Sequence, residues 1–135
     1  MRFVDTNILL YAVSTDSRER TKADVARFIL NSSDLALSVQ VLQEFYVQST
    51  RRSRGGALSH EQAERLINAF SRFPVQETTI DVLESALGAT QRFRISFWDA
   101  TIIEAARKMN CSVLLSEDLN HGQDYDGVRV QNPFK

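Results

Sequence analysis

Short apolar segments with the composition of buried strands alternate with longer amphipathic segments along this chain. The apolar segments lie at residues 2–6, 35–38 and 111–116, with the sequences RFVDT, LALS and CSVLLS. Near-continuous apolar runs of this length are typical of strands that are covered on both faces. Helical patterns between such strands predict crossover connections. The alternation therefore predicts an α/β fold with a mostly parallel central sheet.

Capping residues predict where the helices begin. We expect helices after Asp16 or Ser17, Ser38, Ser59, Thr78 or Thr79, and Ser96, the first four extending to about residues 31, 52, 73 and 93. The apolar positions expected on these helices include Phe28, Leu83 and Leu87, of which the last two are expected on a buried side. Two further strands are expected at residues 75–78 and 128–132, the second at the edge of the sheet.

Composition and charge limit the class of protein. The chain has 135 residues, 43% hydrophobic and 24% charged, which predicts one globular domain spanning residues 1–135. A net charge of −1 argues against a basic nucleic-acid coat protein. Cys111 is the only cysteine, so an internal disulfide is impossible and a buried thiol is expected. No apolar stretch has the length of a membrane span and no signal-type segment begins the chain, so we expect a cytoplasmic protein without membrane contact.

Four acidic residues stand at informative positions in this outline. Asp5 ends the first strand, Glu44 lies mid-helix among large apolar residues, Asp99 lies in the first turn of a helix, and Asp118 follows the strand at 111–116. Each position has an ordinary explanation when taken alone. Asp99 favours the helix dipole, Asp118 suits a turn, and Glu44 fits the polar side of its helix.

A shared cleft for these four carboxylates would require a cation. Two carboxylates about 5 Å apart repel by about 3 kcal/mol at an effective dielectric near 20. A divalent cation removes that repulsion, and because the set contains no His or Cys, we expect Mg²⁺, or Mn²⁺ as a substitute. Such an ion suits phosphodiester hydrolysis. Thr6, Asn7 and Ser116 either hold metal-bound water and orient carboxylates or satisfy local backbone groups.

Five segments, in order, give the chain a recognisable pattern: VDTNILLYA, QVLQEFYV, FWDATIIEAA, LLSEDLNHG and the terminal QNPF. These segments resemble those of the PIN-domain ribonucleases, and more narrowly the VapC toxins of bacterial toxin–antitoxin pairs. The resemblance runs from Phe3 to Phe134 and is weakest at about residues 52–95.

This resemblance implies a three-layer α/β/α domain and Mg²⁺-dependent endoribonuclease activity on an RNA substrate. It also implies a homodimer, inhibition by a small VapB-like antitoxin, and DNA contact only through that antitoxin. The family's acidic site falls on Asp5 and Asp99 as principal metal ligands, on Glu44, which completes the site or orients water, and on Asp118, which acts directly or through water. Ser116 occupies the family's usual Ser/Thr position.

Several other side chains admit two interpretations. The cluster RRSRGG at 51–56 is either a solvated loop or an RNA contact in which Arg51, Arg52 and Arg54 bind phosphates. Trp98 and Tyr46 could stack on bases, although core packing is the favoured role for both. His121 is expected to make local hydrogen bonds rather than to act in catalysis.

Three other classes of protein compete with the nuclease. A haloacid-dehalogenase-like phosphotransferase would carry a second Asp where this chain has Asn7, and a receiver-type domain would carry paired acids after the first strand. A regulatory binding module that acts with an antitoxin on DNA, with little nuclease activity, is the alternative that stays open. Four clustered carboxylates argue against a purely structural module, which has no reason to tolerate their repulsion.

Overall fold

The computed structural model describes residues 1–52 and 55–135. Its elements in chain order are β1 (Arg2–Val4), α1 (Thr6–Ala12), a 3₁₀ turn η1 (Ser17–Glu19), α2 (Arg20–Leu30), β2 (Leu35–Ser38), α3 (Val39–Ser49), α4 (His60–Phe70), β3 (Val75–Gln76), α5 (Ile80–Phe93), α6 (Phe97–Lys108), β4 (Val113–Leu115), β5 (Asp124–Tyr125) and β6 (Val128–Gln131).

The strands of the described residues form one sheet in the order β3-β2-β1-β4-β6-β5. All neighbours pair in parallel except β5 and β6, which form an antiparallel hairpin. The central pair is β1 and β4, with Val4 opposite Leu115. Asp5 and Ser116, the residues that follow these two positions, therefore leave the sheet at the same edge.

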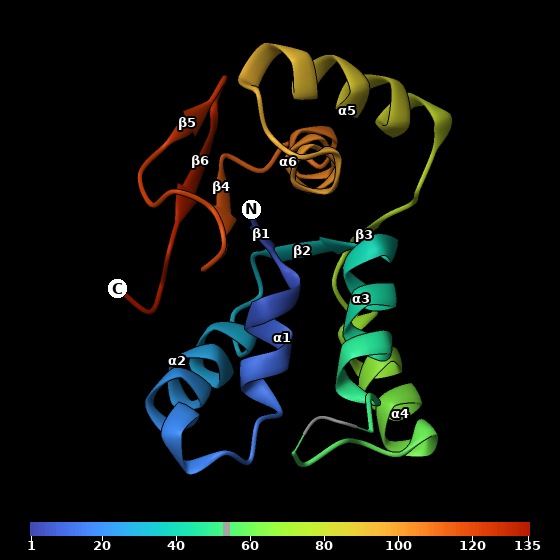
Figure 1. Cartoon of the computed structure of the whole chain (residues 1–135), viewed down its shortest axis with the longest axis vertical. Helices are drawn as coiled ribbons and strands as arrows, with labels where there is room; N and C mark the ends of the chain where they lie inside the picture. The colour runs from blue at the N-terminus through green and yellow to red at the C-terminus, as the bar shows by residue number, and fades with distance from the viewer. Residues whose placement is uncertain (53–54) are drawn as a thin grey trace.

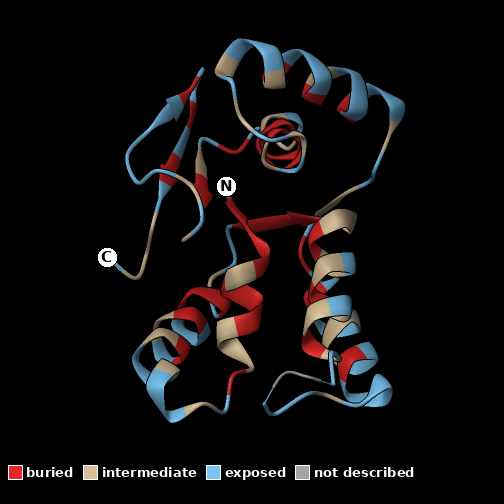
Figure 2. Cartoon of the chain, in the orientation of Figure 1, coloured by how far each residue is buried: buried red, intermediate tan, exposed pale blue. Residues whose placement is uncertain are grey.

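Helices cover both faces of the sheet, which confirms the predicted α/β/α arrangement. Helices α5 and α6 lie on one side, and α1, α2, α3 and α4 lie on the other (Figure 1). Helix α6 is buried along its whole middle, from Ala100 to Ala106, between the sheet and α5 (Figure 2). Its first turn, which contains Asp99, is thereby fixed relative to the sheet.

Four predicted helix starts are confirmed, because Ser38, Ser59, Thr79 and Ser96 each cap a helix with their side chains. The sequence interpretation missed α1. The apolar run that contains Ile8 does not extend the first strand. It forms this helix, and the Asp5 side chain caps the N-terminus of the helix. The first strand is correspondingly shorter than predicted and ends at Val4.

Three other expectations were wrong. The strand at residues 128–131 is not the edge of the sheet, because the short strand β5, which was not predicted, pairs with its outer side. Leu83 and Leu87 on α5, both expected on a buried side, are 38% and 53% exposed. Phe28 on α2, for which burial was not predicted, is 79% exposed. The apolar residues of these two helices thus cover a wider face than the part of each helix that packs against the described residues.

No helix of residues 1–52 and 55–135 combines the length and the apolar character that crossing a membrane requires.

Candidate active site

Asp5 lies at the junction of β1 and α1, at the carboxyl end of the central strand. The backbone N–H of Thr6 donates a hydrogen bond to its Oδ1 at 2.7 Å, and the Ser116 hydroxyl donates to its Oδ2, also at 2.7 Å. The side chain is buried. Burial raises the pKa of Asp5 from 3.8 to about 6, although these two hydrogen bonds lower it. The site therefore holds a carboxylate that is costly to ionise without a cation.

Asp118 lies on the exposed turn after β4 and is tied to α1 by Asn7. The Asn7 amide donates to Asp118 Oδ2 at 3.2 Å and approaches Ser116 Oγ at 3.4 Å. The Asp118 backbone N–H donates to the same Ser116 oxygen at 3.1 Å. Ser116 thus contacts Asp5, Asn7 and Asp118 at once, which explains why a small hydroxyl residue suits this strand end.

Glu44 enters the site from α3 and is half-buried. Thr6 Oγ1 donates to its Oε2 at 2.7 Å, and the Gln40 amide, one helical turn earlier, donates to its Oε1 at 2.9 Å. Both carboxylate oxygens are therefore oriented by neutral donors. Neither Thr6 nor Gln40 neutralises the charge of Glu44, so this carboxylate adds full negative charge to the site.

Asp99 enters from the first turn of α6, where its backbone N–H donates to the cap residue Ser96 at 3.1 Å. A pocket of about 540 Å³ is lined by all four predicted acids, Asp5, Glu44, Asp99 and Asp118, together with Gln40, Gln43, Val47, Gln48, Arg51, Trp98 and Ile102. Four separate parts of the fold, the β1–α1 junction, α3, α6 and the turn after β4, thus bring these carboxylates around one cavity.

The donor set of this pocket fits a hard divalent cation. Its titratable donors are carboxylates, and Mg²⁺ prefers oxygen ligands. Among the described residues, no group of three or more His, Cys, Asp or Glu side chains is arranged closely enough to enclose an ion. Mg²⁺ does not require such a cage, because it usually keeps several waters and binds through one or two carboxylates.

The predicted cationic residues are only partly placed at this pocket. Arg51 lines it, and Arg52 is exposed in the turn that follows α3. Arg54 lies outside the described residues. An arginine at the wall of an acidic pocket supplies a positive contact for an anionic ligand, while the carboxylates alone would repel that ligand.

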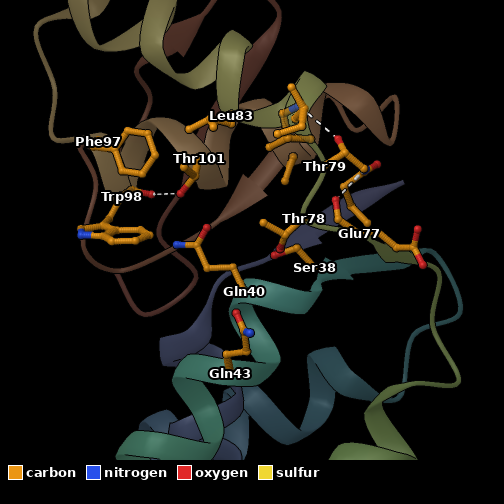
Figure 3. Close-up of a pocket in the computed structure, with 14 residues that line it drawn as sticks. Ser38, Gln40, Gln43, Glu77, Thr78, Thr79, Leu83, Phe97, Trp98 and Thr101 are labelled. Carbon is orange, nitrogen blue, oxygen red and sulfur yellow. Dashed lines mark hydrogen bonds between the residues drawn. The ribbon is translucent and has the colours of Figure 1, made fainter.

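A second, largely apolar pocket of about 420 Å³ adjoins the acidic pocket and shares Gln40, Gln43 and Trp98 with it. Figure 3 shows the Gln40 side chain extending toward the Trp98 ring. Trp98 is 64% exposed, so the expectation of core packing was wrong. Its ring packs edge-on against Phe97, with ring centroids 5.0 Å apart, and contributes to the walls of both pockets. Tyr46 is half-buried, and its hydroxyl pairs with His60 Nδ1 at 3.0 Å.

Two residues that sequence reasoning set aside have structural partners. His121 Nδ1 accepts a hydrogen bond from the Asn132 backbone at 3.0 Å, which agrees with the expected local role. Cys111 is buried, and burial raises the pKa of its thiol, so it is a poor nucleophile.

Two residues in and beside the pocket were missed by sequence reasoning. Gln40 was not singled out in the sequence, although its spacing of four residues from Glu44 is a usable signal for an orienting contact. Glu117 was not singled out, although it directly precedes Asp118. No local sequence pattern shows that these two neighbouring acids have different roles.

Comparison with known proteins adds a family and a fold. The family model of the PIN domain matches residues 2–123. A toxin–antitoxin complex from Klebsiella pneumoniae contains a similar chain, with a TM-score of 0.68 and 20% identity over 98% of both chains. VapC20 of Mycobacterium tuberculosis, a sarcin-ricin loop cleaving toxin, superimposes with a TM-score of 0.65 and 23% identity over 87% of this chain and 90% of that one.

A third similar structure is DNA-bound VapBC from Salmonella typhimurium, with a TM-score of 0.65 and 18% identity over 98% of this chain and 97% of that one. No curated protein matches the chain in sequence. At these identities the structural likeness establishes the fold, and the four carboxylates around one pocket carry the chemical argument.

Proposed function

Because the chain belongs to the PIN domain family, we propose that it is a metal-dependent endoribonuclease and the toxin of a toxin–antitoxin pair. The observation that carries the proposal is the pocket of about 540 Å³ lined by Asp5, Glu44, Asp99 and Asp118. A neutral ligand would leave the repulsion among four carboxylates uncompensated. A divalent cation would compensate it and could at the same time bind the phosphodiester group of a substrate.

In this proposal Asp5 and Asp99 are the principal ligands of Mg²⁺, for which Mn²⁺ can substitute. Glu44 completes the site or orients water, and Asp118 acts directly or through water. The bound ion would polarise a phosphoryl oxygen and lower the pKa of a water molecule. The oxygen donors on four different elements support this assignment, since a hard cation selects carboxylates and water over nitrogen and sulfur.

The protein's own hydrogen bonds orient two of the four carboxylates, Asp5 and Glu44, before any ligand binds. Ser116 and the Thr6 backbone hold Asp5, while the Thr6 hydroxyl and Gln40 hold Glu44. Glu44, with both oxygens oriented and no cationic partner among these donors, is suited to accept a proton from the attacking water or to orient it. Prearranged groups of this kind need little reorganisation during reaction.

RNA binding in this proposal begins with Arg51, which lines the acidic pocket and contacts a phosphate next to the scissile bond. Arg52, exposed in the turn after α3, contacts a further phosphate. The sequence extends the same expectation to Arg54, which lies outside the described residues. Arginine suits this role because its guanidinium group can bind a phosphate through two hydrogen bonds. We also propose that the protein acts in the cytoplasm.

The proposed partners are a VapB-like antitoxin, which carries the contact with DNA, and a second copy of the chain. Structures of a toxin–antitoxin complex and of DNA-bound VapBC support the first by their similarity to this chain. Exposed apolar side chains support the second. Ile80, Leu83 and Leu87 follow a spacing of three and four residues on α5, and Trp98 lies at the same apolar pocket as Ile80 and Leu83.

The decisive experiment measures RNA cleavage by purified, antitoxin-free protein in Mg²⁺ and in EDTA, for the wild type and for Asp5→Asn. Asp5→Asn keeps the shape of the side chain and removes one ligand charge. We expect cleavage by the wild type in Mg²⁺ alone, and a loss of about a hundredfold or more in Asp5→Asn.

Asp24→Asn is the matched control, because Asp24 is an exposed acid on α2 outside the pocket, and it should cleave as the wild type does. Equal cleavage in Mg²⁺ and EDTA, or equal rates for Asp5→Asn and Asp24→Asn, would contradict the mechanism. Absence of cleavage under every condition would favour a regulatory binding module.

A further inference from the structure

Glu117, the residue that precedes Asp118, forms a cluster with Tyr11 and Lys22. The Tyr11 hydroxyl donates to Glu117 Oε1 at 2.5 Å, and Lys22 Nζ forms an ion pair with Glu117 Oε2. Lys22 also donates to the Tyr11 hydroxyl at 3.3 Å. The Glu117 and Lys22 side chains are only 24% and 41% exposed. All three polar groups thus satisfy one another in a partly buried setting, where such pairs are better ordered than on an open surface.

This cluster and the acidic pocket share one short turn. The Glu117 backbone N–H donates to Asn7 Oδ1 at 3.3 Å, and the Asn7 amide donates to Asp118 Oδ2 at 3.2 Å. The two neighbouring acids therefore differ in function. Asp118 lines the acidic pocket, while Glu117 is neutralised by Lys22 and ties the turn to α1 and α2.

The C-terminal segment covers the same cluster. The Phe134 ring packs edge-on against Tyr11 with ring centroids 4.9 Å apart, and Lys22 Nζ lies 5.8 Å from the Phe134 centroid. The Phe134 backbone N–H donates to Asn132 Oδ1 at 2.9 Å, and the Asn132 N–H donates to His121 at 3.0 Å. These contacts give a structural role to the terminal QNPF segment and to His121, neither of which reaches the acidic pocket.

We propose that Tyr11, Lys22 and Glu117 are positioning residues that hold Asp118 at the acidic pocket. This inference rests on the proposed nuclease function, in which Asp118 acts beside Asp5. Asp118 is exposed and lies among other carboxylates. Electrostatic repulsion and the conformational freedom of its side chain both favour orientations in which its carboxylate points away from the pocket. An anchored Glu117 restrains the backbone of the turn. Lys22 also removes the negative charge that an unpaired Glu117 would add next to the pocket.

The first test is Lys22→Met, with Lys108→Met as a matched control. Lys108 also pairs with one carboxylate, Asp81 at 2.6 Å, and its exposure of 35% is close to the 41% of Lys22, but neither Lys108 nor Asp81 lines the pocket. We expect Lys22→Met to lower kcat by about tenfold or more, with KM within about twofold of the wild type. Lys22→Arg, which keeps the charge, should restore most of the lost rate.

The second test measures backbone hydrogen exchange and does not depend on RNA cleavage. The amides of Glu117 and Asp118 should exchange about tenfold faster in Lys22→Met than in the wild type. The Asp5 amide, which donates to the Leu115 carbonyl at 3.0 Å, is the internal reference and should be unchanged. Glu117→Gln keeps the shape and the acceptor for Tyr11, and it replaces Lys22→Met if that variant does not fold.

The outcomes separate this inference from the proposed function. If the wild type does not cleave RNA, the nuclease proposal fails, and the exchange measurement alone decides whether the cluster orders the turn. Faster exchange at the Asp5 amide as well would indicate general destabilisation and would overturn a positioning role. A positioning role is also overturned if Lys22→Met behaves as Lys108→Met does, or if the turn loosens without any loss of kcat.

Discussion

Asp5 combines a structural task with a position in the acidic pocket. It caps α1 through the Thr6 backbone and accepts the Ser116 hydroxyl, so it is tied to both central strands. Its burial raises its pKa from 3.8 to about 6. A pKa difference of about two units corresponds to about 3 kcal/mol, so the ionised Asp5 destabilises the metal-free fold by up to about that amount.

This cost predicts that Asp5→Asn stabilises the protein in EDTA at pH 7.5. The amide keeps the size of the carboxylate and its acceptor for Thr6, while it removes the buried charge. We expect the Tm to rise by up to about 10 °C in thermal unfolding followed by circular dichroism. Asp118→Asn is the control, because Asp118 is exposed, and its gain should be clearly smaller.

The pH dependence of this difference follows from the same shift. Between the unfolded pKa of 3.8 and the folded value of about 6, the folded state binds more protons than the unfolded state. Asp5 therefore lowers the stability of the wild type as pH rises through this window, and its effect is constant above it. The gap in Tm between wild type and Asp5→Asn should close near pH 4. A gap of equal size at pH 4 and pH 7.5 would refute a charge effect.

At the scale of helices and strands, the sequence predicts the features that depend on neighbouring residues, such as the residue that caps a helix. Ser38, Ser59, Thr79 and Ser96 were recognisable caps because each precedes an amphipathic run and can bond its own backbone. Helix α1 was missed because Asp5, its cap, was interpreted only as the end of a strand. Most of this short helix is buried, so its sequence lacks the alternation of apolar and polar faces by which an amphipathic helix is recognised.

The capping box of α4 provides a test at this scale. Ser59 accepts a hydrogen bond from the Gln62 backbone at 3.1 Å, and the Gln62 side chain accepts from the Ser59 backbone at 2.9 Å. Ser59→Ala should lower the free energy of unfolding by about 1 kcal/mol in urea titrations, because the Gln62 N–H loses its partner. RNA cleavage should not change, since α4 does not line the pocket. A loss below about 0.3 kcal/mol would show that solvent replaces the cap.

At the scale of the whole molecule, parallel pairing explains how the candidate site could be anticipated. The acids at Asp5 and Asp118 were predictable because parallel strands end at one edge, where ligands bind in open α/β sheets. The contact between Glu117 and Lys22 was not predictable, because it depends on how α2 packs against the turn after β4. The exposure of Trp98 and Leu83 was equally hidden, since helical periodicity does not say whether an apolar face is covered by the same chain.

That exposed face leads to a prediction about assembly. Ile80, Leu83 and Leu87 are 69%, 38% and 53% exposed on one side of α5, which is a costly surface for an isolated chain. Burial of this surface against a second copy would explain it. Leu83→Glu should therefore convert the protein to a monomer in sedimentation velocity, because two charged side chains would enter an apolar interface.

Phe28→Glu is the control for that substitution, because Phe28 is even more exposed, at 79%, but lies alone on α2. It should leave the oligomeric state unchanged. The apolar pocket beside Leu83 shares Trp98, Gln40 and Gln43 with the acidic pocket, so loss of the dimer should also alter RNA cleavage. A monomeric wild type at tens of micromolar, or identical behaviour of both variants, would mean that α5 is exposed for another partner, for which the antitoxin is the first candidate.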